Sequence, residues 1–577
     1  MKTVNISADF AVVGGGLAGL CAAIAGAREG LKTVLIHDRP VLGGNASSEI
    51  RMWVCGAHGD NNRESGIIEE ILLENIYRNP ERNFSLWDTV LYSNAIREKN
   101  LTLLLNCVCM DAKMDGDKIK SVKAYQSPSQ TFYNIEANYF CDSSGDSILA
   151  ELSGAEVRYG REGRGEFNES IAPEVADKKT MGMSCLLQAR ETDQVHEFIA
   201  PEWANHYTDD SQFQYRTPEL EGLQNYWWIE LGGDMDALHD VDECRHELLK
   251  IAIGTWDYLK NHPTQKEKNK YWELEWIGFL PGKRESNRYV GDYIVTQNDV
   301  AMGGKFQDTI AYGGWTMDDH APTGFKVPEI APNIFHPAPS PFGLPYRAIY
   351  SKNIKNLFCA GRNISVTHSA LSATRVMATC AILGQAVGVA AALANKNQVE
   401  PRKVDVKKLQ NRLMELDCYL PNFRYIPSDL TMCATLTSDN NKNPEGLRMG
   451  QNRITIEADE AWYAKKGDSV EYSWSVPVKL SESRLIFDSD FSDFQPKNIV
   501  ALRFKDQPKL EMPSCLVKKY RLDYCDKNGN YQTLGEFTND YQRLVFNKLD
   551  IECTKIRFTL LETFGDEEVK VFAWTVK

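Results

Sequence analysis

The stretch that decides the fold runs from residue 10 to residue 45 and reads FAVVGGGLAGLCAAIAGAREGLKTVLIHDRPVLGGN. Its two apolar runs, residues 10–13 and 33–36, predict buried strands. Between the two runs, Gly14, Gly16 and Gly19 have the spacing G-x-G-x-x-G. The small, helix-favouring residues 22–27 follow them. A strand, a glycine turn, a helix and a strand within about 30 residues form the βαβ unit that a dinucleotide-binding fingerprint requires. The sequence therefore predicts a site where main chain approaches a pyrophosphate at a helix N-terminus.

The residue expected to bind a ribose is where this chain departs from the usual pattern. An acidic residue is expected about 20 residues after the fingerprint, at the end of the second strand. That position holds His37, and Asp38 follows it. Two interpretations remain open: His37 donates to the ribose directly, or the strand ends one residue later and Asp38 takes the role.

Length and composition narrow the class of protein. A chain of 577 residues is too long for one hydrophobic core, which predicts two to four domains. The net charge of −14 disfavours binding to nucleic acid or to anionic membranes. Residues 1–10 lack the apolar segment of a signal peptide, and the small-residue run 378–394 is typical of a buried helix rather than a membrane span. The 14 cysteines include no C-x-x-C pair, which favours a reduced, cytoplasmic protein without a metal site.

Later stretches return to the opening theme. Residues 101–110 predict another buried strand, and residues 139–146 predict a strand that ends in a turn at Gly145 and Asp146. Residues 356–363 again combine an apolar strand with a glycine turn. A polar loop is expected over 365–374, then a helix over 375–393 whose Gly384 and Gly388 permit close packing. The nucleotide-binding domain is therefore predicted to be discontinuous.

The other regions differ in composition. Six of the 12 tryptophans fall between Trp203 and Trp276, a cluster that forms either a core or a substrate-facing cap. Beyond a turn-rich break at 439–446, alternating residues such as Val470 and Tyr472 predict strands, and Asn528-Gly529 predicts a hairpin. We predict a nucleotide-binding domain in two parts (1–150 and 346–400), a cap (151–345), a helical linker (401–438) and a β-sandwich (439–577). Because the sandwich follows both parts of that domain, we expect it to be dispensable for cofactor binding.

Five motifs together resemble a known family. They are GGGLAGLCAAIAGAREG with RPVLGGN, LFCAGRNISVTHSALSATRVMATCAILGQAVGVAAAL, NYWWIELGG, LPGKRESNRYVGDYIVTQNDV and YGGWTMDDHAP. The chain resembles bacterial FAD-dependent oxidoreductases of the glutathione-reductase-type fold, which commonly carry a jelly-roll-like C-terminal domain. The resemblance implies an α/β, FAD/NAD(P)-binding Rossmann-like fold with an inserted cap and a C-terminal β-sandwich. It also implies bound FAD and a redox reaction, without naming a substrate.

The resemblance also implies which residues touch FAD. In such proteins a Gly-Gly pair after the second strand lets main chain run along the flavin, although an ordinary surface turn would look the same. The helix predicted from Arg375 would point its N-terminus at the pyrimidine edge of the flavin. The cofactor-binding candidates are Gly14, Gly16, Gly19, His37, Asp38, Arg39, Gly43, Gly44, Asn45, Ser47, Val108, Gly145, Asp146, Gly361, Arg362, Arg375 and Val376.

Three residues from polar loops are the catalytic candidates: Arg284, His320 and His368. In such a reaction the flavin takes a hydride from the substrate while a base removes a proton from it. A histidine suits the second task. A structural, hydrogen-bonded histidine is the alternative at each position. Arg284 would clamp an oxyanion of the substrate.

The leading interpretation is an FAD-dependent dehydrogenase or oxidase that takes a hydride from a small polar substrate, which the aromatic residues of the cap suggest is a sugar or glycoside. One alternative is a fumarate-reductase-like enzyme acting on the carbon–carbon double bond of a carboxylate. Another is a flavin-containing binding protein without turnover. We expect a small-molecule substrate and an electron acceptor, and neither nucleic acid nor a membrane as partner. The identity of the acceptor and the oligomeric state stay open.

Overall fold

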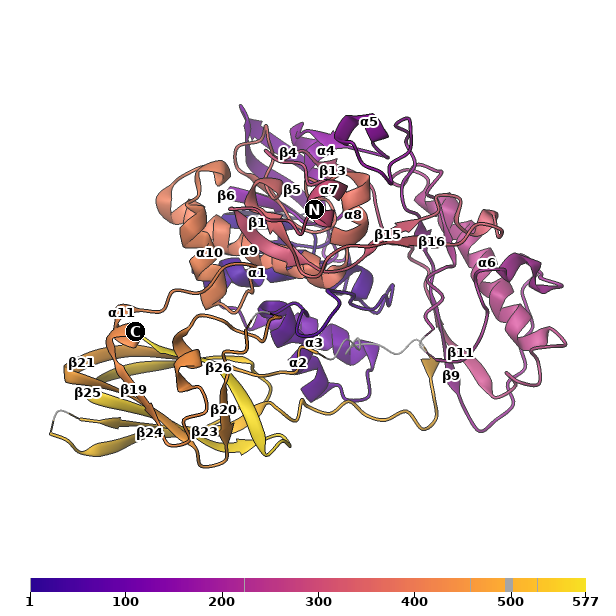
Figure 1. Cartoon of the computed structure of the whole chain (residues 1–577). Helices are drawn as coiled ribbons and strands as arrows, with labels where there is room; N and C mark the ends of the chain where they lie inside the picture. The colour runs from indigo at the N-terminus through magenta and orange to yellow at the C-terminus, as the bar shows by residue number, and fades with distance from the viewer. Residues whose placement is uncertain (1, 223, 457, 493–501, 527) are drawn as a thin grey trace. The chain divides into compact units, whose positions relative to one another are not determined.

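The computed structural model describes residues 2–222, 224–456, 458–492, 502–526 and 528–577. The chain forms two compact units (Figure 1). The first unit contains residues 1–57, 81–406 and 498–509, and the second contains residues 58–80, 407–497 and 510–577. Two segments therefore lie in a unit other than the one that flanks them in sequence, namely 58–80 and, among the described residues, 502–509.

The first unit is built on a seven-stranded sheet in the order β3-β2-β1-β6-β5-β4, with β18 also paired to β6. The pairs β3·β2, β2·β1, β1·β6 and β6·β18 are parallel, whereas β4 and β5 form an antiparallel extension. The predicted βαβ unit is confirmed as β1, α1 and β2. The strands of the sheet and the helix α1 are β1 (Lys2–Val13), α1 (Leu17–Arg28), β2 (Thr33–Ile36), β3 (Leu101–Leu104), β4 (Cys107–Asp115), β5 (Lys118–Gln126), β6 (Thr131–Asp142) and β18 (Leu357–Cys359).

The strand predicted over residues 101–110 is two strands. The protein backbone turns at Asn106, whose φ of 52° lies in the left-handed region that asparagine tolerates better than most residues. Before the turn, β3 pairs in parallel with β2, and after it β4 pairs antiparallel with β5. The apolar run is continuous because both strands are partly buried, so hydrophobicity alone does not reveal the break.

The segment after β18 also differs from its prediction. Residues 368–374, expected in a loop, form the helix α8 (His368–Thr374), because Thr367 caps its first turn by accepting from the main-chain N–H of Ala370. The following helix α9 (Met377–Asn397) begins two residues later than predicted. Its small face packs on α1: a Cβ on Gly384 would lie 2.0 Å from the main-chain O of Ala18. Among the described residues α9 alone is long and apolar enough to cross a membrane, and 89% of its apolar window is buried, as in a core helix.

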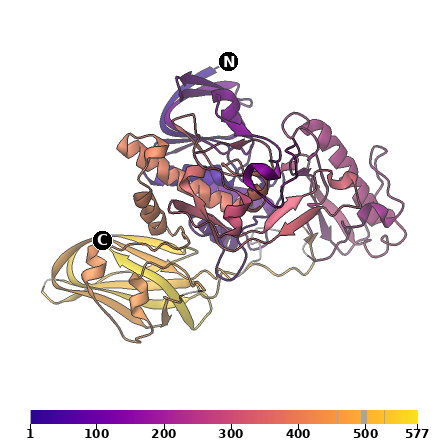
Figure 2. The ribbon, with the colours of Figure 1, turned by 45° about the horizontal axis from the view of Figure 1, so that its top comes forward.

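The region between the two parts of the sheet carries short strands around an aromatic core. The core includes Trp228, Trp256, Trp272 and Phe325. The helix α6, which supplies Trp256, lies away from α1 in both views (Figures 1 and 2). One small sheet has the order β10-β8-β12 and another the order β11-β9-β22. These elements are β8 (Met183–Ser184), β9 (Leu187–Glu191), β10 (Glu230–Leu231), α6 (Val241–Asn261), β11 (Trp272–Ile277), β12 (Gly282–Lys283) and β22 (Leu502–Arg503).

Two hairpin-like pairs complete the first unit. The strand β15 pairs antiparallel with β16, and β14 pairs with β17. Further short elements are β7, which pairs with β13, and the helices α3, α4, α5 and α7. Their bounds are α3 (Phe84–Ile96), α4 (Ile148–Ser153), β7 (Val157–Arg158), α5 (Arg164–Phe167), β13 (Arg288–Tyr289), α7 (Gln297–Ala301), β14 (Thr309–Gly313), β15 (Met317–His320), β16 (Asn333–His336) and β17 (Phe342–Pro345).

The second unit is an antiparallel β-sandwich in the order β20-β26-β21-β25-β23-β24, with β19 paired to β21. Its core contains Trp462, Tyr472, Phe558 and Trp574. The predicted hairpin is confirmed, because β23 and β24 are joined by a turn in which Gly529 has a φ of 86°. The elements are α2 (Ile67–Arg78), α10 (Val406–Glu415), α11 (Asp429–Cys433), β19 (Thr435–Ser438), β20 (Trp462–Lys465), β21 (Ser469–Phe487), β23 (Val517–Cys525), β24 (Tyr531–Thr538), β25 (Leu544–Thr563) and β26 (Glu568–Val576).

The segment 58–80 is held within the second unit by apolar and polar contacts. Leu73 and Ile76 of α2 pack with Tyr541. The buried guanidinium of Arg453 donates to the main-chain O of Asn61 at 2.9 Å and to Ser65 Oγ at 2.9 Å. These contacts give the sandwich a structural task that its position at the end of the sequence does not indicate.

The sandwich remains predicted to be dispensable for cofactor binding, but these contacts indicate that it is needed to keep the protein soluble. We expect a protein truncated near Asn440 to aggregate, because α2 would lose its partners and expose Leu73 and Ile76. The measurement is size-exclusion chromatography of the truncated and full-length proteins expressed side by side. A soluble, monodisperse truncated protein that holds FAD would contradict this expectation.

Candidate flavin and proton-transfer site

The three fingerprint glycines have different surroundings. Gly14 has a φ of +105°, and a Cβ there would lie 2.3 Å from the main-chain O of Ser143. A Cβ on Gly19 would lie 1.8 Å from the main-chain O of Gly14. At Gly16, by contrast, φ is −62° and, among the described residues, the nearest heavy atom to an added Cβ is the Cα of Gly44 at 3.9 Å. The protein itself therefore requires glycine at positions 14 and 19, but it leaves open space at Gly16.

That open space lies between two glycine turns and a helix N-terminus. Gly16 is the N-cap residue of α1. The main-chain N–H of Gly43 donates to the main-chain O of Gly15 at 2.9 Å, which holds the second turn against the first. The unpaired amides at the start of a helix favour an anion in such a position.

The residues at the end of β2 divide into a buried and an exposed group. His37 is buried and bonded to main chain on both ring nitrogens, whereas the side chain of Asp38 is 56% exposed. Arg39 lies beside Asp38, with 4.0 Å between Arg39 Nε and Asp38 Oδ2. After Gly44, Asn45 Nδ2 donates to the main-chain O of Lys283 at 2.9 Å, and Ser47 is fully buried.

The segment that follows β6 and the segment that follows β18 meet at Asp146. This carboxylate accepts from Lys283 Nζ at 2.8 Å, from Ser286 Oγ at 2.8 Å and from Arg362 Nη2 at 3.0 Å. Burial raises the pKa of Asp146, but Arg362 and Lys283 outweigh it and hold that pKa below its usual range. A Cβ on Gly145 would lie 2.7 Å from the guanidinium of Arg362. The structure thus brings Gly145, Asp146 and Arg362 together, with Gly361 directly before Arg362.

The remaining cofactor candidates lie elsewhere in the first unit. Val108 is on β4 and is 49% exposed. Val376 is the N-cap of α9, and Arg375 Nη2 donates to Asp318 Oδ2 at 3.1 Å. Arg375 therefore connects the start of α9 to the strand β15.

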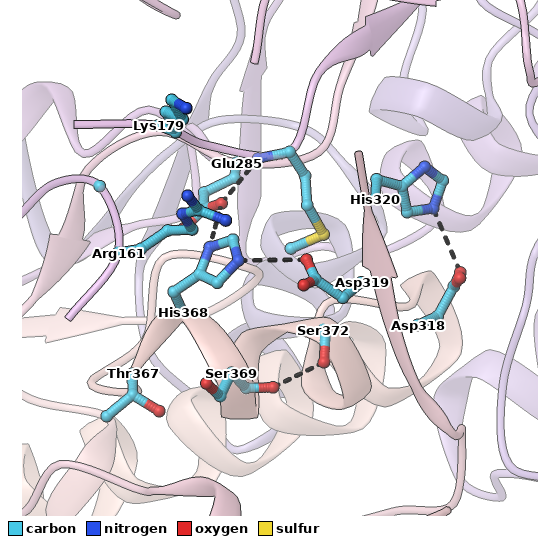
Figure 3. A network of polar contacts seen from close by, with 12 residues as sticks. Arg161, Lys179, Glu285, Asp318, Asp319, His320, Thr367, His368, Ser369 and Ser372 are labelled. Carbon is cyan, nitrogen blue, oxygen red and sulfur yellow. Dashed lines mark hydrogen bonds and ion pairs between the residues drawn. The ribbon is translucent and has the colours of Figure 1, made fainter. Parts of the chain in front are cut away.

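A buried polar network surrounds His368 (Figure 3). His368 is the first residue of α8; its Nδ1 lies 2.8 Å from Glu285 Oε2 and its Nε2 lies 3.2 Å from Asp319 Oδ1. Burial lowers the pKa of His368, but the charge of Glu285 and the hydrogen bonds to both carboxylates outweigh it and raise this pKa to about 10. The ring is therefore an imidazolium at neutral pH and cannot accept a proton, which conflicts with the base role predicted for it.

His320 occupies a similar position at the end of β15. Its Nδ1 lies 2.7 Å from Glu230 Oε2 and its Nε2 lies 3.3 Å from Asp318 Oδ2. The ring packs edge-on against Trp227, with 5.3 Å between ring centroids. Figure 3 shows the pair of Asp318 and His320 beside the group formed by Asp319, His368 and Glu285.

Arg284 is not placed as a substrate clamp. Its side chain is 7% exposed, and it donates to Ser184 Oγ at 2.8 Å and to the main-chain O of Trp227 at 3.2 Å. Glu230 balances its charge, with 3.3 Å between Arg284 Nη1 and Glu230 Oε1. Burial lowers the pKa of Arg284, and Glu230 opposes that effect. Its contacts position Glu230 and hence His320.

Sequence reasoning missed the carboxylates of this network: Glu230, Glu285, Asp318 and Asp319. The signal was present, because Glu285 follows Arg284 directly and Asp318-Asp319 precede His320 directly. Charged residues in adjacent positions are costly to bury unless they pair. Among the described residues no group of three or more His, Cys, Asp or Glu side chains is arranged to hold a metal ion.

The sequence matches the family described as FAD dependent oxidoreductase over residues 9–413, well over half of the chain. This protein belongs to that family. It is therefore an FAD-dependent oxidoreductase, and its cofactor is FAD. No curated protein matches the sequence.

Two solved structures illustrate how distant the structural relatives are. The family 32 carbohydrate-binding module of Streptococcus pneumoniae EndoD is 14% identical; the match spans 26% of this protein and 99% of the module, with a TM-score of 0.21. The L-proline dehydrogenase from P. horikoshii is 17% identical; the match spans 28% of this protein and 26% of the dehydrogenase, with a TM-score of 0.17. Scores this low support no argument about fold or substrate.

The residues at the glycine turns fit FAD. The protein's own packing does not require glycine at position 16, where a side chain would enter the open space in which a pyrophosphate would lie. The turn at Gly43-Gly44 and the amides at the start of α1 would hold the pyrophosphate. Asp146 accepts hydrogen bonds from three protein donors and is still 31% exposed, so its role as a cofactor-binding residue stays a prediction.

The contrast between the glycines gives a direct test of the pyrophosphate position. We expect Gly16→Val to fold but to lose FAD, because its Cβ lies at an ordinary contact distance of 3.9 Å from Gly44 Cα and its methyl groups extend into the space that the ligand needs. The measurement is the visible flavin spectrum together with the thermal unfolding temperature. Gly165→Ala, at another glycine with open surroundings, is the control and should keep the flavin. A yellow Gly16→Val protein would exclude this position for the pyrophosphate.

Proposed function

We propose that this flavoenzyme oxidises a small polar substrate and that Asp319, oriented by His368, receives the substrate proton. When bound, FAD supplies the acceptor for a hydride. The substrate X–H group would lose its proton to the Asp319 carboxylate as the hydride leaves the adjacent carbon. Residues 151–345 would then act as the substrate-facing cap, since they supply Glu285 and Asp319.

Accessibility within the network carries this proposal. The side chain of Asp319 is 24% exposed, whereas His368 is 5% exposed and Glu285 is fully buried. Asp319 is therefore the member of the line Asp319–His368–Glu285 that a substrate can reach. Burial raises the pKa of Asp319, but the hydrogen bond from His368 outweighs it and keeps this carboxyl charged at neutral pH. An ionised carboxylate is able to accept a proton, and the fixed cation behind it orients the acceptor.

The charges of this network are buried at an energetic cost. Placing an imidazolium between two carboxylates inside a protein costs desolvation, which its partners offset only with good geometry. Strongly perturbed groups beside a cofactor-binding fold mark candidate sites of chemistry. The combination with the family assignment favours turnover over a binding role without catalysis.

We expect Asp319→Asn to slow reduction of the bound flavin about 10²–10⁴-fold, because the amide cannot take up the proton. The flavin absorption spectrum should stay unchanged. The measurement is anaerobic bleaching of the flavin by hydroxy acids, amino acids and polyols, followed by stopped-flow kinetics with the donor that bleaches the wild type. Asp234→Asn, at a carboxylate of similar exposure (30%) paired with Lys326, is the matched control. Wild-type rates in Asp319→Asn would overturn the assignment.

The raised pKa of His368 predicts a pH-dependent stability. Because its pKa in the folded protein is about 10, above the ordinary value of 6.5, its contribution is complete below pH 6.5 and is lost as the pH rises to about 10. We expect the difference in thermal unfolding temperature between wild type and His368→Gln to shrink over this window. A difference that stays constant between these pH values would show that His368 is not held as a cation.

A further inference from the structure

Arg161 lies beside the His368 network and is held by Asp177. The main-chain N–H of Arg161 donates to the main-chain O of Asp177 at 3.0 Å, and the main-chain N–H of Asp177 donates back at 3.1 Å. Arg161 Nε donates to Asp177 Oδ1 at 3.0 Å, and Arg161 Nη2 donates to Asp177 Oδ2 at 2.6 Å. Figure 3 shows the guanidinium next to Glu285 and His368. Asp177 therefore fixes both the main chain and the side chain of Arg161.

The charge of Arg161 acts on the carboxylates of the network. Hydrogen bonds to Asp177 raise the pKa of Arg161, burial opposes them, and the charges of Asp319 and Glu285 raise that pKa further. Burial raises the pKa of Asp319, whereas His368, His320 and Arg161 lower it. Exposed charges act on one another in this way within about 10 Å, the Debye length at ordinary ionic strength. Two hydrogen bonds of about 3 Å each leave about 4 Å of that distance, which a molecule of a few carbon atoms spans.

Asp177 uses only one edge of the Arg161 guanidinium. An arginine side chain has five N–H donors, and Asp177 takes one from Nε and one from Nη2. Among the described residues, Arg161 Nη1 makes no hydrogen bond and no ion pair. The two Nη atoms form a second edge on which a carboxylate accepts two parallel hydrogen bonds. Arg161 thus keeps a two-pronged donor for a second anion.

Exposure distinguishes Arg161 from the other arginines near the network. The side chain of Arg284 is 7% exposed and that of Arg288 is 1% exposed. The side chain of Arg161 is 19% exposed, and that of Asp319 is 24% exposed. Arg161 and Asp319 are therefore a cation and an anion that one substrate can reach together.

We propose that the substrate carries a carboxylate and that the Nη1–Nη2 edge of Arg161 binds it. This inference rests on the proposed function, in which Asp319 receives the proton of the substrate X–H group. The carboxylate anchors one end of a short hydroxy acid or amino acid at Arg161 and brings the X–H group to Asp319. It takes no part in the bond changes. A neutral sugar or polyol has no charge to pair with this edge, so the same contact selects against it.

The first experiment measures binding without turnover. The full-length protein with its flavin is titrated by calorimetry with propionate and benzoate, which have no X–H group to oxidise, and with propionamide and benzamide. We expect the acids to bind about tenfold or more tightly than their amides, because a hydrogen bond to a charged acceptor is lost in the amide. Inorganic phosphate, an anion of different shape, should bind more weakly than the acids.

Variants assign this binding to Arg161. Arg161→Gln should weaken acid binding about 10–100-fold, and Arg161→Lys should weaken it by a smaller factor, because a point charge replaces only part of the fork. Asp177 is 29% exposed and stays hydrated in Arg161→Gln, so this variant should fold and remain yellow. Arg161→Lys keeps a charge for Asp177 and serves if the first variant is unstable. The control is Arg347→Gln, at an arginine that pairs with Asp308 through the same two nitrogen atoms, and it should bind the acids as the wild type does.

Four results of these titrations would overturn the proposal. They are equal binding of acid and amide, binding of neither acid at millimolar concentration, phosphate binding as tight as that of the acids, and wild-type acid binding in the Arg161 variants. None of them depends on proton transfer, so they leave the assignment of Asp319 untouched.

The second experiment compares donors of the same shape by anaerobic bleaching of the flavin. The pairs are lactate with lactamide and alanine with alaninamide, and glycerol is the neutral polyol. We expect each amide and glycerol to bleach the flavin about tenfold or more slowly than the acids at equal, subsaturating concentration. Glycerol or an amide as the fastest donor would overturn the carboxylate and leave the role of Asp319 in place. Wild-type bleaching by the acids in Asp319→Asn, with their advantage over the amides intact, would overturn the proposed function alone.

Discussion

The close approach of α1 and α9 is the constraint on which the first unit depends. Added Cβ atoms at Gly384 and Gly388 would lie 2.0 Å and 2.4 Å from the main-chain oxygens of Ala18 and Ala22. These contacts join main chain to main chain, so neighbouring side chains have no freedom to relieve a larger residue. They bring two parts of the sequence that are more than 300 residues apart onto the same sheet, and with α9 they bring α8 and His368.

The buried charges near α8 follow from this convergence. Glu285, Asp319 and His368 come from three separate segments, and each satisfies a polar atom of another. Removing one partner would leave the others buried without compensation, which costs more than the pair gains when intact. Such a cluster stabilises the fold little in comparison with apolar packing, which is why we attribute it to the proton transfer proposed for Asp319.

Local spacing allowed the βαβ unit, the glycine turn and the hairpin at Gly529 to be predicted from sequence, because each depends on residues close together in the sequence. The prediction was wrong at residues 101–110 and 365–374, because it missed the break at Asn106 and the helix α8. The break depends on a single left-handed residue, and the helix depends on the cap provided by Thr367. The carboxylate partners of the two histidines were missed for a different reason. Three of the four pairings join residues about 50 to 90 positions apart, which no spacing rule encodes, whereas Asp318 lies two residues from His320.

The short strand β22 has a consequence for how the protein is made. Leu502 belongs to the aromatic core around Trp256 and Trp272, and β22 pairs in parallel with β9. In the nascent polypeptide, Leu502 is synthesised about 180 residues after Phe325, the preceding buried member of this core. N-terminal units usually fold first during synthesis, which adds about 5–20 residues per second to the polypeptide. Here the sheet of β9 in the first unit stays incomplete until residues 502–503 have been made, and until then one edge of β9 lacks its partner strand.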